Sequence, residues 1–144
     1  MFLHFMKLIP EWYEHQNCLI AWPCNKGLYG EIINNARDEV ANVINEIAKT
    51  EDVIVLSNKE NINEIKSKTV HEKIYILECK LDDSWMRDIG PIFYSEDKKL
   101  KSISFDFNGY GKYPDYYNDN KVSKFISNYL NIPTKTSDLV IEGG

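Results

Sequence analysis

Residues 82–91, Asp82-Asp83-Ser84-Trp85-Met86-Arg87-Asp88-Ile89-Gly90-Pro91, bring together three carboxylates, a guanidinium and a large aromatic ring. An apolar run of strand length comes directly before this stretch and another directly after it, which predicts a loop at the exit of a strand. A carboxylate beside a large aromatic ring can hold a guanidinium ion, because the carboxylate accepts two parallel N–H bonds and the ring takes the cation on its face. The stretch therefore predicts a binding site.

A structural role for the same residues is equally open at this point. Asp88 could pair with Arg87 or cap a turn, and Trp85 could belong to the core, because loops with ion pairs are common in proteins that bind nothing there. Residue types alone do not separate the two interpretations.

On the N-terminal side of the stretch, strands alternate with helices. Apolar residues at helical spacing predict a helix over residues 31–49, and the shorter runs around it read as strands or as a short helix. The expected inward face of the long helix comprises Ile33, Ala36, Val40, Val43, Ile44 and Ile47. Strands are expected over 17–22, 52–57 and 73–79, and a short helix with Ile62 and Ile65 inward over 59–68. This alternation predicts an α/β fold with some parallel strand pairing.

On the C-terminal side, residues 91–95 and 100–107 read as a hairpin around the polar turn 96–99. A loop rich in glycine and tyrosine follows over 108–117; it could cover a ligand or simply pack on its own domain. Asp119 is expected to cap a second amphipathic helix. The inward face of that helix would comprise Val122, Phe125, Ile126, Tyr129 and Leu130. A last strand, 138–141, leads into Glu142-Gly143-Gly144.

The chain thus reads as two unequal passes of strands and a helix. Each pass ends in a carboxylate followed by glycine, at Asp88-Ile89-Gly90 and at Glu142-Gly143-Gly144. If the passes are related by a rotation, as in repeat architectures, these ends would converge near an axis.

Composition narrows the classes of function. The 144 residues are 43% hydrophobic and 27% charged, with a formal net charge of −5, as in an ordinary globular protein. The acidic balance and the scattered lysines argue against a nucleic-acid partner, and no apolar run is long enough for a membrane span. Three cysteines without a CxxC pattern signal neither a disulfide framework nor a metal site. A cytoplasmic protein with no metal or other cofactor is the expectation.

Five blocks in order resemble the agmatine deiminase family, which is also described as the Porphyromonas-type peptidylarginine deiminase family. They are Pro10-Glu11-Trp12, Ala21-Trp22-Pro23, Trp85 to Pro91, Phe107 to Gly111 and Val140 to Gly144. The resemblance covers essentially the whole chain. It implies the pentein fold, a propeller of five α/β modules around a central substrate, of which residues 1–144 would form about two modules, an incomplete N-terminal part of one catalytic domain.

The resemblance also implies roles for single residues. By matching position, Asp88 and Glu142 would bind the substrate guanidinium and Trp85 would line the same pocket. Tyr110 falls where the family commonly has tryptophan, so its contact with the substrate is a weaker expectation. The substrate would be agmatine, a small cationic guanidine, converted to N-carbamoylputrescine and ammonia on a route to putrescine; a peptidylarginine substrate is the alternative.

Catalytic residues of the family are not expected in this chain. The family's His-x-Asp block and nucleophilic cysteine lie beyond the Glu-Gly-Gly block, and the histidines here, His4, His15 and His71, are not followed by such an aspartate. The three cysteines read as buried or incidental thiols. A non-catalytic guanidine-binding module is the competing interpretation, and in either case uncovered module edges predict poor stability or self-association.

Overall fold

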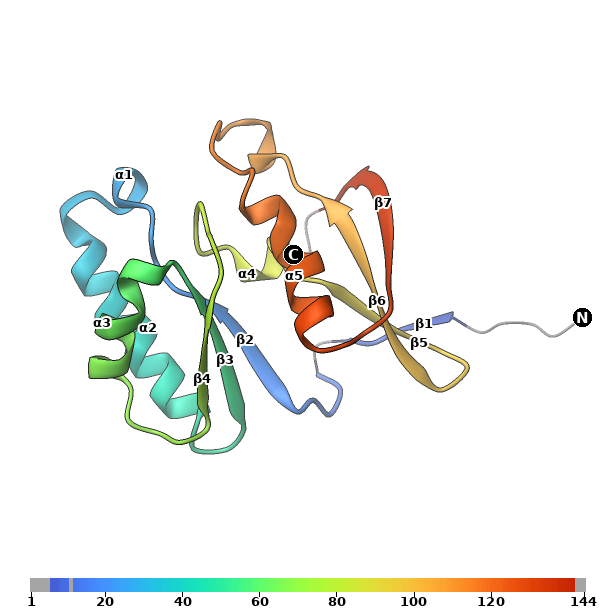
Figure 1. The fold of residues 1–144 in the computed structure, drawn as a ribbon, viewed down its shortest axis with the longest axis horizontal. Coiled ribbons are helices and arrows are strands. Elements are labelled where there is room, and N and C mark those ends of the chain that lie inside the picture. The colour runs from blue at the N-terminus through green and yellow to red at the C-terminus, as the bar shows by residue number, and fades with distance from the viewer. Residues whose placement is uncertain (1–5, 11, 142–144) are drawn as a thin grey trace, which may run out of the picture. The chain divides into compact units, whose positions relative to one another are not determined.

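The computed structural model describes residues 6–10 and 12–141, which fall into two compact units (Figure 1). One unit is His15–Met86; the other combines Met1–Glu14 with Arg87–Gly144. Each unit has its own sheet, one of three strands and one of four. The predicted α/β class is confirmed.

The unit His15–Met86 is built on a parallel sheet. Its strands are β2 (Asn17–Ala21), β3 (Asp52–Ser57) and β4 (Ile74–Glu78), in the order β2-β3-β4. Cys18 lies opposite Val53, and Val53 opposite Ile74, in parallel register. Every residue of β3 after Asp52 is buried, as expected for the central strand of a parallel sheet.

Two helices connect these strands. The main helices are α2 (Ile33–Ile47) and α3 (Ile62–Lys68), each entered through a 3-10 turn, and a short helix α1 (Lys26–Tyr29) precedes α2. Both predicted helices are therefore confirmed, although α2 is shorter than expected. The prediction that Val43 faces inward is wrong, because its side chain is 52% exposed; Arg37 and Ala41 lie on the buried face instead.

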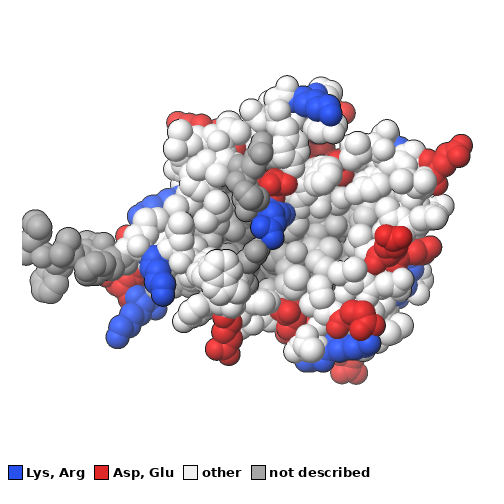
Figure 2. Space-filling model, turned by 180° about the vertical axis from the view of Figure 1, so that it is seen from behind, with Lys and Arg blue, Asp and Glu red and all other residues white. Residues whose placement is uncertain are grey.

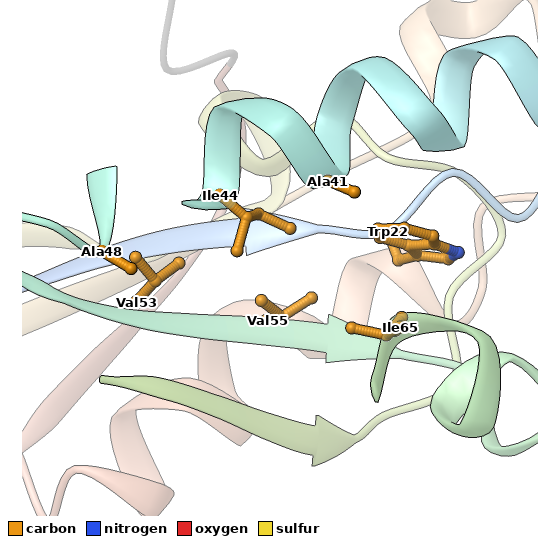
Figure 3. Packing of buried hydrophobic residues seen from close by; sticks show 7 residues of the cluster. All are labelled: Trp22, Ala41, Ile44, Ala48, Val53, Val55 and Ile65. Carbon is orange, nitrogen blue, oxygen red and sulfur yellow. The ribbon is translucent and has the colours of Figure 1, made fainter. Parts of the chain in front are cut away.

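The core of this unit lies between the helices and one face of the sheet. Figure 3 shows side chains from α2, α3, β3 and the residue after β2 meeting there. They are Trp22, Ala41, Ile44, Ala48, Val53, Val55 and Ile65. The small residues Ala41, in α2, and Ala48, just after it, allow this part of the chain to approach the sheet closely. Burial of each large aliphatic side chain contributes about 1.5–3 kcal/mol.

Arg37 is buried in the same unit and donates hydrogen bonds from all three of its side-chain nitrogens. Its Nε donates to the Pro23 carbonyl at 3.0 Å, and its two terminal nitrogens donate to Glu64 at 2.8 Å and Asn61 at 3.0 Å. The guanidinium therefore ties α2 to the chain that leaves β2 and to the start of α3. A buried cation is tolerated here because it is paired and hydrogen-bonded.

The other unit carries a mixed sheet in the order β1-β5-β6-β7. Its strands are β1 (Met6–Leu8), β5 (Ile92–Glu96), β6 (Lys99–Asp106) and β7 (Thr134–Val140). β5 and β6 form the predicted antiparallel hairpin, whose two-residue turn has positive φ at Asp97 and Lys98. Positive φ at both positions matches the twist of the strands, so the hairpin closes tightly.

Helix α5 (Val122–Tyr129) connects β6 to β7, which run parallel. Val122 and Ile126 are buried as predicted, but Tyr129 is 51% exposed, so its predicted inward position is wrong. Asp119 begins a 3-10 turn ahead of the helix rather than capping it, and its side chain is buried. The last strand begins at Thr134, four residues earlier than predicted.

Charged side chains are scattered over the surface. On the face drawn in Figure 2, Lys and Arg side chains are separated by acidic and uncharged side chains rather than forming a continuous stripe. In the part of the chain that the structure describes, no helix has the length and apolar character needed to cross a membrane.

Candidate functional site

The loop between β4 and the short helix α4 (Met86–Ile89) is fixed by the ends of neighbouring strands. Asn58, just after β3, donates to the Leu81 carbonyl at 3.1 Å and accepts from the Leu81 amide at 2.8 Å. The Cys24 thiol, in the chain after β2, lies 3.6 Å from the same carbonyl. The loop therefore starts from a fixed point at the carboxyl ends of parallel strands, where ligand sites are common in α/β proteins.

Two residues further on, Asp83 and Trp85 are joined by a hydrogen bond. The Trp85 indole Nε1 donates to Asp83 Oδ2 at 2.7 Å, and the Ser84 amide donates to Asp83 Oδ1 at 2.7 Å. Asp83 is buried, whereas Trp85 is 40% exposed. The alternative that Trp85 belongs to the core is therefore wrong.

Asp88 lies in the other unit, on α4, and Tyr110 binds it. The Tyr110 hydroxyl donates to Asp88 Oδ2 at 2.6 Å, and the Asp88 side chain is partly buried. The structure thus brings together two of the four residues that were expected to contact substrate. An oxygen that already accepts one hydrogen bond retains a second lone pair, so the carboxylate can still receive N–H donors.

The backbone of the loop and its aromatic neighbours fix the position of the Tyr110 ring. Tyr110 has φ +59°, which is uncommon for a residue other than glycine, and its ring meets the Phe107 ring edge-to-face at 5.2 Å. Gly109 also has positive φ, and a Cβ there would lie 3.2 Å from Tyr116 and 3.3 Å from Tyr113. The strained backbone at Tyr110 is therefore preceded by a tightly packed glycine and supported by the contact of its ring with Phe107.

The other two residues predicted to contact substrate are Glu142 and Trp85. Glu142 lies outside the described residues, and Trp85 lies in the unit that does not contain Asp88. Sequence reasoning missed Asp83, because an aspartate in a polar loop gives no sign that it will be buried. The only available signal was its position two residues before a tryptophan with an N–H to satisfy.

The environment of Cys18 disfavours a reactive thiolate. Burial, with a smaller contribution from the charge of Glu51, raises the pKa of the Cys18 thiol, which disfavours the reactive thiolate. Cys79 is buried as well. The His15 Nε2 atom lies 2.7 Å from Glu51 Oε2, so this histidine is paired with a residue outside the loop 82–91. Among residues 6–10 and 12–141, no cluster of three or more His, Cys, Asp or Glu side chains could hold a metal ion.

Comparison with known proteins identifies the family. A sequence model of the Porphyromonas-type peptidyl-arginine deiminases matches residues 7–144. The chain belongs to this family. Its relatives include a protein named "Putative agmatine deiminase" from Mycoplasma capricolum, which is 30% identical over 140 residues, covering 93% of this chain and 38% of the relative.

Solved structures agree with this assignment. The agmatine deiminase of Enterococcus faecalis superimposes with a TM-score of 0.90 at 20% identity, over 96% of this chain and 40% of that one, which shows a shared fold. An agmatine deiminase of C. jejuni with substrate bound has a TM-score of 0.81 at 27% identity, over 100% of this chain and 43% of that one. The two units are thus part of a pentein fold, as predicted, and the chain spans about two fifths of the length of the relatives it matches.

Proposed function

We propose that this chain supplies part of the guanidinium-binding site of a guanidine deiminase, with agmatine as the substrate. The observation that carries the proposal is the Asp88 carboxylate, which lies in the Trp-Met-Arg-Asp-x-Gly-Pro block and is oriented by the Tyr110 hydroxyl at 2.6 Å. The names of the relatives support agmatine as the guanidine.

The proposed chemistry converts agmatine to N-carbamoylputrescine and ammonia, a step towards putrescine. A cysteine thiolate attacks the guanidinium carbon, ammonia leaves with a proton, and water then cleaves the carbon–sulfur bond to give the ureido product and restore the thiolate. The role proposed for this chain is binding: Asp88, with Glu142 as a second carboxylate, would hold the planar cation with its carbon face open to the thiolate.

The test is binding of agmatine to the protein, measured by calorimetry or by NMR titration. Asp88→Asn is nearly isosteric and removes the charge, so affinity should fall by at least about tenfold, because a charge-assisted hydrogen bond contributes roughly 1.5–3 kcal/mol. Asp82→Asn, in the same loop, is the matched control and should bind as the wild type does. Cadaverine, a diamine of similar length without a guanidine group, should bind far more weakly than agmatine.

Two results would refute the assignment. One is equal agmatine affinity in the wild type and in Asp88→Asn. The other is a lowered melting temperature for Asp88→Asn with unchanged affinity of the folded protein, which is what a purely structural Asp88 predicts.

A second candidate substrate is peptidyl-arginine, favoured by the description of the matching family. The two substrates differ beyond the shared guanidinium, since agmatine ends in an amine and peptidyl-arginine in two amide groups. Parallel titrations with agmatine and with N-acetyl-arginine amide decide between them. Tighter binding of the blocked arginine would make the protein a peptidyl-arginine binder.

A further inference from the structure

Both oxygens of the Asp83 carboxylate accept hydrogen bonds from their own loop. Oδ1 accepts from the Ser84 amide at 2.7 Å and from the Ser84 hydroxyl at 3.4 Å, and Oδ2 accepts from the Trp85 indole at 2.7 Å. Asp83 is 7% exposed, and Trp85 is 40% exposed. The buried Asp83 carboxylate thus binds the edge of the Trp85 ring, which remains accessible from solvent.

We propose that Asp83 is a positioning residue that fixes the plane of the Trp85 indole as a platform for a planar cation. A hydrogen bond to a carboxylate is about twice as strong as one between neutral groups, and it defines the rotation of the ring about its side-chain bonds. A ring held before binding loses less conformational freedom when a ligand stacks on it. What the proposal says about the ligand rests on the proposed function; what it says about the ring does not.

The geometry requires aspartate rather than asparagine. Asparagine has one side-chain oxygen, so it can accept from the Ser84 amide or from the indole, and its NH2 group would then face a second N–H donor. Asp83→Asn should therefore release the ring without removing any packing volume.

Other contacts of the loop allow a control for general loosening. The Tyr29 hydroxyl lies 2.7 Å from Ser84 Oγ, and Asn58 holds Leu81. Tyr29→Phe removes one anchor of the loop but leaves both oxygens of Asp83 in contact with their donors. A residue that merely shapes the loop would make these two variants behave alike.

The first measurement is the exchange of the tryptophan indole N–H protons with water, followed by 15N NMR. The chain has three tryptophans, which serve as internal standards: Trp12 is 84% exposed and Trp22 is fully buried. The signals are assigned with Trp12→Phe and Trp85→Phe. The Trp85 N–H should exchange at least about tenfold more slowly than that of Trp12, despite the exposed ring, because it is hydrogen-bonded.

The variants then show whether Asp83 causes the slow exchange of the Trp85 N–H. Asp83→Asn should shift the Trp85 signal and bring its exchange rate towards that of Trp12. Tyr29→Phe and Asp82→Asn should change neither the position of the Trp85 signal nor its exchange rate. Fast exchange of Trp85 in the wild type would overturn the proposal even if Asp83→Asn fails to fold. Equal effects of Tyr29→Phe and Asp83→Asn would also overturn it.

A double-mutant cycle on agmatine binding tests the platform role. Asp83→Asn should weaken binding several-fold in the wild type but have no further effect in Trp85→Phe, where no indole N–H remains to be held. Additive losses would show that Asp83 does not act through Trp85. If the wild type binds no agmatine, the proposed function and the platform role fail together, while the exchange measurement still decides whether Asp83 fixes the ring.

Discussion

At the scale of single residues, Cys18 shows how the fold suppresses a reactive group. Its side chain is partly buried in β2, and burial followed by the nearby charge of Glu51 raises the pKa of its thiol. Both effects disfavour the negatively charged thiolate, which is the form that reacts with electrophiles. An unactivated thiol in a strand agrees with its interpretation as a small hydrophobic residue.

We therefore expect Cys18 to react slowly with iodoacetamide at neutral pH. Because the raised pKa shifts thiolate formation to higher pH, its labelling rate should still be rising at a pH where an unperturbed thiol has already levelled off. Mass spectrometry of timed samples, with the denatured protein as the reference, measures the rate at this site. Labelling of Cys18 in the folded protein as fast as in the denatured one would contradict the expectation.

Among the elements, α2 provides a buried ion pair at Arg37 and an exposed one at Glu46, and the two pairs should differ sharply in their contribution to stability. Arg37 is buried and pairs with Glu64 and two further acceptors, whereas Lys49 pairs with Glu46 near the end of the helix with both side chains exposed. Breaking the buried cluster leaves acceptors without their donor, whereas exposed pairs contribute little.

Arg37→Met should therefore lower the free energy of unfolding by about 2–4 kcal/mol, and Lys49→Met by less than about 0.5 kcal/mol. Urea unfolding of both variants, followed by circular dichroism, provides the comparison. Similar losses for the two variants would show that the Arg37 cluster does not stabilise the fold.

The hairpin of β5 and β6 predicts a pH dependence. Glu96 accepts a hydrogen bond from Lys101, with Lys135 nearby at 3.6 Å, and this lowers the pKa of the Glu96 carboxyl group. A carboxyl group with a lowered pKa in the folded state stabilises the protein above its unfolded pKa, and this contribution is lost as pH falls through the folded pKa. Glu96→Gln should thus lower the melting temperature at neutral pH and have no effect in strong acid. The exposed Glu39→Gln is the control, and a pH-independent effect of Glu96→Gln would contradict the argument.

Patterns along the sequence predicted the positions of these helices and strands well, but they predicted less well which side chains of a helix face the core. The spacing of apolar residues predicted α2, and the polar residues 96–99 predicted the hairpin, because both signals are local. The burial of Arg37 and Asp83 could not be predicted, since each depends on partners brought together by the fold or on a specific loop geometry. The Tyr110–Asp88 contact joins residues 22 positions apart, so the sequence could name both residues but not their bond.

For the molecule as a whole, exposed apolar side chains lie on the edge strand β7 and on the residue that follows it. Leu139, Val140 and Ile141 are 64%, 48% and 38% exposed, and β7 pairs with β6 on one side, at the end of the strand order. An exposed apolar edge strand favours pairing with another chain. We expect concentration-dependent self-association in sedimentation experiments, reduced by Leu139→Lys but not by Val43→Lys on the exposed face of α2. A monomer at all concentrations would contradict this expectation.

The pairing of β1 with β5 has a consequence for synthesis on the ribosome. Met6 lies opposite Glu96, so these partners are 90 residues apart in sequence, whereas the unit His15–Met86 is one continuous stretch. Contacts between distant segments form late, and nascent chains fold from the N-terminus as they emerge. The unit His15–Met86 should therefore fold first, and β1, although it precedes this unit in the sequence, should stay unpaired until β5 has been synthesised.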